Sequence, residues 1–378
     1  MKILVIPTTD WVRHPVPNRL NFIFDVLAER NEVFILHFNI GQFSDNVPRK
    51  TRCHLIKSGP FPVRDPSLYY LCNAPFHLIS LIRLVKSNHI DVIVSANILP
   101  SLFCVFQKKP VVFDYLDHLE ESASVYYPDS AAGKIIRFAV RAVTRFNLRH
   151  SSSIITVSRD FADYLQSEGF SDVQIIPNGV DTHALQPVPI DEAKQKLGLE
   201  GPVIGYIGSL EYWVDLETVI SALPSLDATL LVVGPGLFTD YGEQLQSLAK
   251  DCGVSDKVRF TGLVPFSDLG LYISAMDIGL NPLKKMAKNE MTVGGKVFNY
   301  LACGKPVLSS RMSAVEHMLG DTLFYYDDVP SFIRMVQAIL ATPENSSGYR
   351  DIALNYDWKA IAAEYEKVLF MAQSRNGP

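Results

Sequence analysis

The chain has 378 residues, a length that predicts two to three domains. Hydrophobic residues make up 48% of it and charged residues 20%, a globular composition that excludes a disordered chain, a coiled coil or a collagen-like rod. The formal net charge of −5 argues against a chain that mainly binds nucleic acid.

Short apolar runs alternate with amphipathic stretches along the first half of the chain. Strands are expected at residues 3–6, 32–37, 92–96, 111–114, 154–157 and 173–176. Helices are expected between them at 19–30, 78–88, 133–150 and 160–166. The strand segments are short and apolar throughout, as parallel strands buried on both faces are. This alternation predicts a parallel, doubly wound sheet.

A second series follows the turn-rich residues 177–189. Its strands are expected at 203–207, 229–233, 258–261, 278–281 and 306–309, and its helices at 215–222, 243–252, 267–275, 296–302 and 330–341, with a last helix at 358–371. We therefore predict an α/β protein with two Rossmann-like, doubly wound parallel-sheet domains, 1–182 and 183–357, facing a cleft. Ligands of such sheets bind at the carboxyl ends of the strands.

A glycine turn ends the first strand of the second series, Val-Ile-Gly-Tyr-Ile-Gly-Ser-Leu at 203–210. Gly208 and Ser209 can bring backbone N–H groups close to an anion, as phosphate-binding turns do. The alternative is a tight strand-to-helix turn that binds nothing.

The most specific segment is Asn-Pro-Leu-Lys-Lys-Met-Ala-Lys-Asn-Glu-Met-Thr-Val-Gly-Gly-Lys-Val-Phe-Asn-Tyr-Leu-Ala-Cys-Gly-Lys-Pro at 281–306. Gly294 and Gly295 open the backbone, and Lys296 begins a helix that ends at Gly304. Free N–H groups, the helix dipole and the Lys296 ammonium converge there, which suits a diphosphate leaving group. The alternative is an exposed first-turn lysine, but a cation is unfavourable at a helix N-terminus unless an anion accompanies it.

Together these segments resemble the retaining family-four glycosyltransferases of GT-B architecture. The subset with the motif Lys-x-Phe-Glu-Tyr-x-Ala-x-Gly-Lys-Pro-Val is the most similar, and here that motif is Lys-Val-Phe-Asn-Tyr-Leu-Ala-Cys-Gly-Lys-Pro-Val at 296–307. Further segments that fit are 156–158, 176–181, 205–209, 232–236, 258–264 and Trp358. The resemblance is good over roughly residues 150–370 and is topological only before them.

The resemblance implies metal-independent transfer of a sugar from a UDP- or GDP-sugar to a polysaccharide, glycan or glycolipid acceptor. The second domain would hold the donor, and the first would bind the acceptor, with helix 358–378 packing back on it. In the retaining mechanism the leaving diphosphate itself helps to deprotonate the acceptor hydroxyl. The implied donor-binding residues are Gly208, Ser209, Gly294, Gly295, Lys296 and Val297 around the diphosphate, and Leu263 and Val264 against the base.

The chain departs from the family pattern in three places. The second of the family's two glutamates, which holds the ribose, is Asn299 here, an uncharged residue that can still hydrogen-bond a hydroxyl. The first falls on Met291, with Glu290 one residue early as either a catalytic contact to the donor sugar or a solvated carboxylate. No cation follows the Gly208 turn, where the sequence is Glu-Tyr-Trp-Val-Asp at 211–215, so Lys296 remains the main charge partner. Its tryptophan, Trp213, either covers the sugar or packs between domains.

The first domain offers candidates on two loops. Asp117 and His118 follow the buried strand 111–114, where relatives often have a histidine, and we expect them to orient the acceptor or handle its proton. The alternative is a capping aspartate beside a surface histidine. The loop after the first strand supplies the expected acceptor-side residues Asp10, Trp11, Arg13 and His14.

The predicted helix 133–150 carries Lys134 and arginines spaced four apart at 137, 141, 145 and 149. With its apolar residues it forms a basic amphipathic helix that could lie on an anionic membrane surface. The alternative is a core-packing helix with a solvated basic face. The first 185 residues carry a net charge of +2 and the remaining 193 a net charge of −7, which favours the membrane hypothesis.

The five cysteines are odd in number and scattered, without a CxxC pair, which predicts reduced thiols in a cytoplasmic protein. No apolar run reaches the ~18 residues of a membrane span, so attachment would be peripheral, on the inner face of the cell membrane. Two other classes stay open: a non-catalytic sugar-nucleotide-binding or assembly protein, and an inverting GT-B enzyme or epimerase. A dehydrogenase is disfavoured because no Gly-x-Gly-x-x-Gly follows the first strand.

Overall fold

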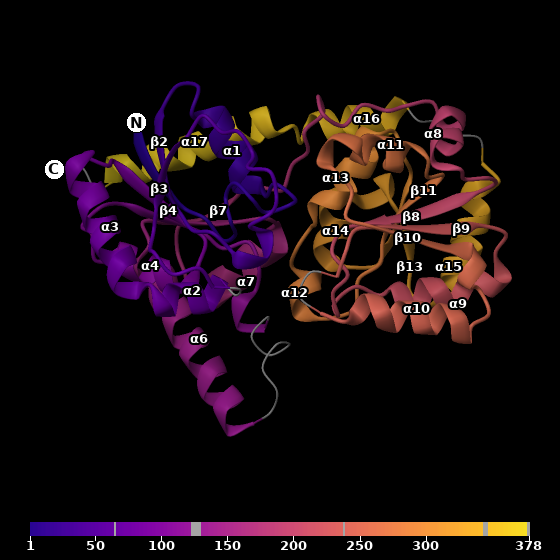
Figure 1. The fold of residues 1–378 in the computed structure, drawn as a ribbon, viewed down its shortest axis with the longest axis horizontal. Coiled ribbons are helices and arrows are strands. Elements are labelled where there is room, and N and C mark those ends of the chain that lie inside the picture. Colours follow the sequence, from indigo (N-terminus) through magenta and orange to yellow (C-terminus); the bar gives the residue numbers. More distant parts are fainter. Residues whose placement is uncertain (64–65, 122–129, 237–238, 343–346, 376–378) are drawn as a thin grey trace. The chain divides into compact units, whose positions relative to one another are not determined.

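The chain folds into two compact units (Figure 1). The computed structural model describes residues 1–63, 66–121, 130–236, 239–342 and 347–375. The first unit comprises residues 1–177 together with the C-terminal segment from Trp358, and the second comprises residues 178–357. The division falls five residues before the expected boundary at 182/183, within the same turn-rich segment.

The first unit is built on a seven-stranded sheet in which all neighbouring strands are parallel. The strands in spatial order are β3 (His54–Lys57), β2 (Glu32–His37), β1 (Lys2–Ile6), β4 (Val92–Ser95), β5 (Val111–Asp114), β6 (Ser153–Thr156) and β7 (Val173–Ile175). Side chains of β1 alternate between two cores, because successive residues of a strand point to opposite faces: Ile3 and Val5 enter one, Leu4 and Ile6 the other.

Helices cover both faces of this sheet (Figure 1). They are α1 (Arg19–Leu27), α2 (Pro66–Cys72), α3 (Ala74–Ser87), α4 (Ile98–Val105), α6 (Ala131–His150), α7 (Arg159–Ser167) and α17 (Trp358–Arg375). The C-terminal helix α17 packs against α1, with Trp358 stacked on Phe22 at 5.3 Å between ring centroids. Beneath them Arg19 and Asp114 form a buried ion pair at 3.5 Å, and the Tyr365 hydroxyl donates to the same carboxylate.

The second unit has a six-stranded sheet, again with every neighbouring pair parallel. The strands in spatial order are β10 (Val258–Gly262), β9 (Thr229–Val233), β8 (Val203–Ile207), β11 (Ile278–Asn281), β12 (Val307–Ser310) and β13 (Phe324–Tyr326). The helices are α8 (Ile190–Leu197), α9 (Leu216–Ala222), α10 (Tyr241–Asp251), α11 (Leu269–Ser274), α12 (Ala287–Glu290), α13 (Gly295–Ala302), α14 (Ser313–Leu319), α15 (Val329–Leu340) and α16 (Ser347–Leu354). One apolar core lies against each face of the sheet. The predicted fold class, two parallel Rossmann-like sheets, is confirmed.

Several short elements are absent from the sequence prediction. The edge strands β3 and β13 and the helices α2, α4, α8, α12, α14 and α16 belong to this set. Most of β3 is exposed, so its sequence lacks the continuous apolar run that marks the central strands. Helices of one or two turns give too few repeats for a 3.6-residue period to stand out.

The amino-terminal half of α6 extends beyond the body of the first unit (Figure 1). Ile135 and Phe138 on this half are 69% and 74% exposed, so the interpretation as a core-packing helix does not hold there. Further along the helix, Arg141 pairs with Glu120 at 3.4 Å and Arg145 with Glu168 at 2.7 Å. Arg141 and Arg145 are therefore already engaged within the first unit. None of the described helices combines the length and apolarity that crossing a bilayer requires.

Candidate functional site

Three glycines end three neighbouring strands of the second sheet. Gly208 follows β8, Gly234 follows β9 and Gly262 ends β10, and their φ angles of 136°, 132° and 68° suit glycine rather than L side chains. Gly208 N–H donates to Val233 O, and Gly234 N–H donates to Gly262 O, each at 3.0 Å. A Cβ on Gly234 would lie 2.1 Å from Gly208 O. The ends of these three strands are therefore closely packed backbone without side chains, and we call Gly208, Gly234 and Gly262 together the shelf.

Lys296 reaches this shelf from the first turn of α13. Its Nζ donates to the Tyr206 hydroxyl at 3.1 Å and lies 4.2 Å from the centroid of that ring. A Cβ built on Gly208 would be 3.5 Å from the same Nζ. The amides of Gly295 and Lys296 occupy helix positions that have no acceptor within the helix. The ammonium thus lies beside the Gly208 turn, and it is carried by the helix whose first-turn amides have no acceptor within the helix; their binding of a diphosphate stays a prediction.

Burial shapes the electrostatics of this lysine. Enclosure of its ammonium lowers the pKa of Lys296 to about 7, because a desolvated cation is less stable than the neutral amine. An anion placed against the ammonium would reverse this shift. The site is therefore unfavourable for a cation by itself and favourable for a cation paired with a phosphate.

Tyr300 fixes α13 to the sheet. Its hydroxyl accepts from Ile207 N at 2.8 Å and donates to Leu280 O at 3.1 Å, so it joins the ends of β8 and β11. Its ring fills the space that a side chain at Gly279 would need, with a Cβ there 2.4 Å from the ring. The tyrosine of the Lys-Val-Phe-Asn-Tyr segment therefore sets the position of the helix that bears Lys296.

Asn178 anchors the loop before α13. Its Nδ2 donates to Val293 O at 2.9 Å, and Gly179 O lies 3.8 Å from a Cβ built on Gly295. Val293 is buried, so this contact fixes the backbone directly before the first turn of α13. The sequence motif at 176–181 had indicated the junction between domains, but its contact with the predicted donor loop emerges only from the fold.

The other predicted donor residues differ in what they can offer. Leu263 directly follows the β10 glycine and is 48% exposed, whereas Val264 packs partly against the core. The Val297 side chain is fully buried and its N–H donates to Gly294 O at 3.3 Å, which leaves it a packing role in this structure. Asn299 is half-buried, one helical turn beyond Lys296.

The Glu290 carboxylate binds the start of a neighbouring helix, α14. Its Oε2 accepts from the Ser313 amide at 2.8 Å and from the Ser313 hydroxyl at 2.9 Å, at the start of α14. This carboxylate is thus engaged within the second unit, and a contact with a donor sugar stays a prediction. Ser313 gave no signal in the sequence, because its partner lies 23 residues away.

The loop after β8 is joined to the loop after β11. Lys284 N–H and Asn289 Nδ2 both donate to Trp213 O at 3.0 Å. The Trp213 ring packs against the cores of the second unit, and Lys288 Nζ lies 4.0 Å from its centroid. Trp213 therefore packs inside the second unit. Beside it lies Glu211, a buried carboxylate that the sequence gave no reason to single out.

In the first unit, His118 is held at the start of a helical turn. Its Nδ1 accepts from the Glu121 amide at 3.2 Å, and its ring packs against Phe161 and Tyr164. Because Nδ1 is an acceptor, the neutral ring carries its proton on Nε2 and presents a donor there. This arrangement favours orientation of a hydroxyl over abstraction of its proton. The neighbouring Asp117 is half-buried.

The loop after β1 is shaped by its own polar residues. Asp10 is fully buried and accepts from the amides of Val12, Arg13 and Ile40 at 3.2, 2.9 and 3.0 Å. Trp11 is buried as well, Arg13 donates to the carbonyls of Ser44 and Asn46, and burial lowers the pKa of His14. Asp10 and Trp11 hold the loop together, and Arg13 and His14 are the two that are partly exposed.

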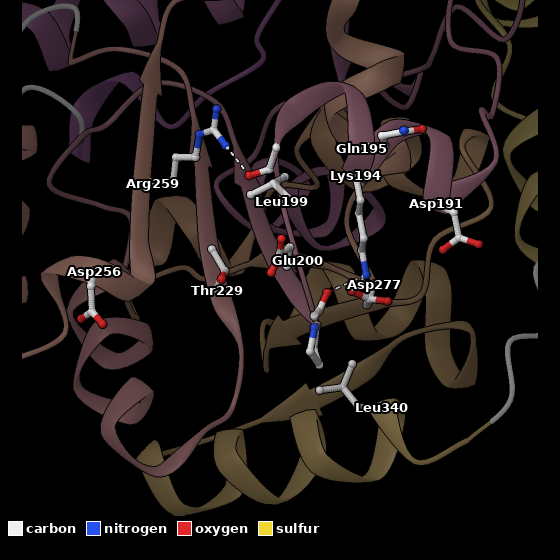
Figure 2. A pocket seen from close by; sticks show the side chains of 13 residues that line it. Asp191, Lys194, Gln195, Leu199, Glu200, Thr229, Asp256, Arg259, Asp277 and Leu340 are labelled. Atoms are coloured by element: carbon white, nitrogen blue, oxygen red, sulfur yellow. Dashed lines mark hydrogen bonds and ion pairs between the residues drawn. The ribbon is translucent and has the colours of Figure 1, made fainter.

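A hollow lies at the edge of the second sheet opposite the shelf (Figure 2). It encloses about 1090 Å³ between α8 and the residues that precede β8, β9 and β11. Its two basic side chains are engaged within the protein: Lys194 pairs with Asp277 at 2.7 Å, and Arg259 donates to the carbonyls of Leu197 and Gly198. Ligands of parallel α/β sheets bind at the other edge, so the shelf remains the candidate site.

Residues 201–342 match the family described as "Glycosyl transferases group 1", and residues 25–184 match "Glycosyltransferase Family 4". The chain is 27% identical over 237 residues to 2-deoxystreptamine glucosyltransferase of Streptomyces kanamyceticus, covering 58% of this chain and 59% of the relative. It is 29% identical over 214 residues to a GDP-mannose-dependent phosphatidylinositol monomannoside mannosyltransferase of Mycolicibacterium smegmatis, covering 51% and 55%. The matches thus span a little over half the length of these curated relatives.

Solved structures agree in fold over nearly the whole chain. Sucrose-phosphate synthase from Thermosynechococcus elongatus has a TM-score of 0.81 at 18% identity, with 99% of each chain covered. HepE from Anabaena, solved in complex with UDP-glucose, has a TM-score of 0.74 at 18% identity, with 98% of this chain and 99% of that chain covered. At these identities the likeness establishes the architecture only. Among the described residues no group of three His, Cys, Asp or Glu side chains could hold a metal ion.

Proposed function

The chain belongs to the group 1, family 4 glycosyltransferases, and from this premise we propose that it transfers a sugar from a nucleotide-sugar donor to a glycan or glycolipid acceptor. The observation that carries the proposal is the shelf of Gly208, Gly234 and Gly262 with the Lys296 ammonium and the first-turn amides of α13 beside it. These groups offer positive charge and N–H donors to a diphosphate at the strand ends.

The donor would lie across this shelf. The exposed Leu263 side chain suits an aromatic base, and the Asn299 amide suits a ribose hydroxyl. UDP and GDP are the two candidate nucleotides: the Anabaena HepE structure contains UDP-glucose, and the Mycolicibacterium relative is GDP-mannose-dependent. No resident cofactor or metal is part of the proposal.

We propose retention of anomeric configuration. The acceptor hydroxyl oxygen attacks the anomeric carbon from the face that the diphosphate leaves, and the electron pair of the broken bond passes to the phosphate oxygen. That oxygen then takes the acceptor proton, so no protein base is required. Lys296 and the nearby amides would stabilise the charge that develops on the leaving group. His118 would orient the acceptor hydroxyl through Nε2–H.

Transfer from a panel of UDP- and GDP-sugars to water or to glycan acceptors tests the proposal, with product anomers assigned by NMR. The wild type should turn over at least one donor with retained configuration, and Lys296→Ala should lose at least about 100-fold in kcat/KM, because it removes the charge that meets the leaving group. The matched control is Arg311→Ala, which removes an exposed ion pair with Glu316 of α14 and should keep its activity. Inverted product would indicate the inverting class, and donor binding without turnover would indicate a non-catalytic protein.

The exposed half of α6 supports a second proposal, attachment to an anionic membrane surface. Its apolar side chains Ile135 and Phe138 stand in solvent on the helix that also bears Lys134 and Arg137, as in helices that lie in a lipid interface. Flotation with phosphatidylcholine vesicles, with and without phosphatidylglycerol, tests it. Binding should require the anionic lipid and should be lost on Phe138→Ser with Arg137→Glu, while Phe370→Ser on α17 should leave it unchanged. Equal flotation of all variants would contradict the proposed membrane attachment through α6 and would not affect the proposed sugar transfer.

A further inference from the structure

A tyrosine hydroxyl joins the Lys296 ammonium to the turn after β8. The Tyr206 hydroxyl accepts from Lys296 Nζ at 3.1 Å and donates to Ser209 O at 2.8 Å. Chemistry fixes both directions, because an ammonium can only donate a hydrogen bond and a carbonyl oxygen can only accept one. The single hydroxyl proton is therefore engaged by Ser209 O, and the lone pairs of the hydroxyl oxygen face the ammonium.

This contact crosses the carboxyl edge of the second sheet. The apolar residues of α13 pack into the core on one face of the sheet, whereas the Tyr206 side chain belongs to the core on the other face. Lys296 therefore reaches past the end of β8, where Gly208 has no side chain. A Cβ at Gly208 would lie 3.0 Å from the Tyr206 hydroxyl and 3.5 Å from Lys296 Nζ. The hydroxyl and the ammonium thus stand together beside this glycine of the shelf.

The tyrosine holds the ammonium in two ways and leaves room for a ligand. Besides the hydrogen bond, the Tyr206 ring centroid lies 4.2 Å from Lys296 Nζ, within the range of a cation–π contact. The Tyr206 side chain is itself buried, which limits its freedom to move. An ammonium has three N–H donors. Within the described part of the chain one of them meets the Tyr206 hydroxyl, which leaves two for the oxygens of a diphosphate.

The hydroxyl favours the charged form of Lys296. Burial lowers the pKa of Lys296 to about 7, so the charge that would meet a diphosphate is only partly present at neutral pH. The lone pairs of the Tyr206 hydroxyl stabilise the ammonium. They cannot stabilise the neutral amine in the same way, because the hydroxyl proton that the amine could accept is bound to Ser209 O.

The titratable neighbours of this contact are Glu211 and Tyr300. Burial and then the Glu211 carboxylate raise the pKa of Tyr206, and burial raises the pKa of Tyr300, so both tyrosines keep their protons near neutral pH. Burial also raises the pKa of Glu211, to about 7. Because Glu211 is present in the wild type and in a Tyr206 variant alike, comparing the two proteins at the same pH isolates the hydroxyl.

We propose that Tyr206 is a positioning residue of the donor site, whose hydroxyl and ring hold the Lys296 ammonium beside the Gly208 turn in its charged form for the diphosphate of the donor. This rests on the proposed function, because it concerns the same donor site. Tyr206 acts through Lys296 and takes no part in the chemical step.

Calorimetric binding of UDP-glucose and GDP-mannose to Tyr206→Phe at pH 6 and at pH 8.5 tests the inference. Phenylalanine keeps the ring but loses both hydrogen bonds of the hydroxyl, which should lower the pKa of Lys296 by about one further pH unit. Relative to the wild type, Kd should rise about tenfold at pH 8.5 and less than about twofold at pH 6, where about half of the lysine or more is charged in both proteins. Uridine and guanosine, which lack the diphosphate, should bind both proteins equally.

A second background shows whether the charge of the lysine is what the tyrosine controls. A guanidinium stays charged without the hydroxyl, so adding Tyr206→Phe to Lys296→Arg should change Kd less than about twofold at either pH. Tyr325→Phe is the matched control, because the Tyr325 hydroxyl also donates to a carbonyl, Gly320 O at 3.0 Å, and its ring also carries a cation, with Arg311 5.2 Å from the centroid. This variant should leave Kd unchanged at both pH values.

Thermal melting of every variant checks that it is folded. Should Tyr206→Phe not fold, 3-fluorotyrosine incorporated at residue 206 keeps both hydrogen bonds but makes the hydroxyl a weaker acceptor. It should then raise Kd at pH 8.5 more than at pH 6, by a smaller factor than phenylalanine. A ratio to the wild type that is the same at both pH values would count against the inference here as well.

Three results would overturn the inference: Tyr206→Phe that binds the donor like the wild type at pH 8.5, Tyr206→Phe that weakens it equally at pH 6 and pH 8.5, and a full loss that persists in the Lys296→Arg background. The last two would give Tyr206 a merely structural role. All three leave the proposed function intact, provided the wild type binds one of the nucleotide sugars and transfers its sugar. A wild type that binds neither and turns over no donor would overturn the proposed function itself, and the inference with it.

Discussion

Donor binding should weaken as the pH rises, because the Lys296 ammonium loses its proton. In the donor-free protein burial lowers the pKa of Lys296 to about 7, so at pH 8.5 only ~3% of the molecules carry this charge. A bound diphosphate favours the charged form and raises that pKa again, which means that binding takes up a proton above pH 7. With the bound lysine fully protonated, Kd should rise about 30-fold between pH 6 and pH 8.5.

Isothermal titration calorimetry with UDP-glucose and GDP-mannose measures this directly, at constant ionic strength. These donors are diphosphate diesters, so they lack the terminal phosphate that titrates at about pH 6 in UDP and GDP. Repeating the titration in two buffers of different ionisation enthalpy gives the proton uptake, expected to be about three quarters of a proton at pH 7.5.

Lys296→Arg separates this lysine from other groups, because a guanidinium stays charged over the whole range. Lys296→Arg should therefore flatten the dependence of Kd on pH. A wild-type Kd that is constant from pH 6 to pH 8.5 would refute the argument that this ammonium binds the diphosphate.

Three further outcomes follow from the same contacts. Lys296→Met should raise the Tm of the donor-free protein at pH 7. The Lys296 side chain keeps its proton up to about pH 10.4 in the unfolded chain but only up to about pH 7 in the folded chain, so this lysine lowers the stability of the folded protein at every pH below about 10.4. A lower Tm for Lys296→Met would contradict this argument. Asn178→Asp, which keeps the shape but loses the Nδ2 donor to Val293 O, should raise the donor KM several-fold at near-constant kcat in initial-rate assays; an unchanged KM would argue against a positioning role. Gly234→Ala should lower the free energy of unfolding, measured by urea denaturation, by about 3 kcal/mol or more, because its Cβ would lie 2.1 Å from Gly208 O. Gly41→Ala, whose Cβ would enter open space, is the control. Equal urea midpoints for the two variants would show that the backbone of the shelf can relax.

The sequence by itself determined the architecture and indicated the centre of the candidate site. Continuous apolar runs between amphipathic stretches have few folded solutions other than parallel sheets covered by helices, and both sheets are confirmed. The contact of Lys296 with the Gly208 turn was predictable as well, because glycine turns and helix N-termini at the carboxyl ends of neighbouring parallel strands meet at one edge. These are local signals, and the chirality of the fold brings them together without further information.

Only the tertiary structure decided which polar groups are partners. Trp213 and Lys288 stand far apart in sequence, and their contact arises because β8 and β11 are neighbours in the sheet. The contact of Asn178 with Val293 connects residue 178 to the predicted donor loop. The Glu290 carboxylate, which the sequence suggested for the donor sugar, binds the start of α14 instead. Residue type and spacing report what a side chain can do, but burial and charge partners decide its protonation and its availability, and these depend on non-local packing.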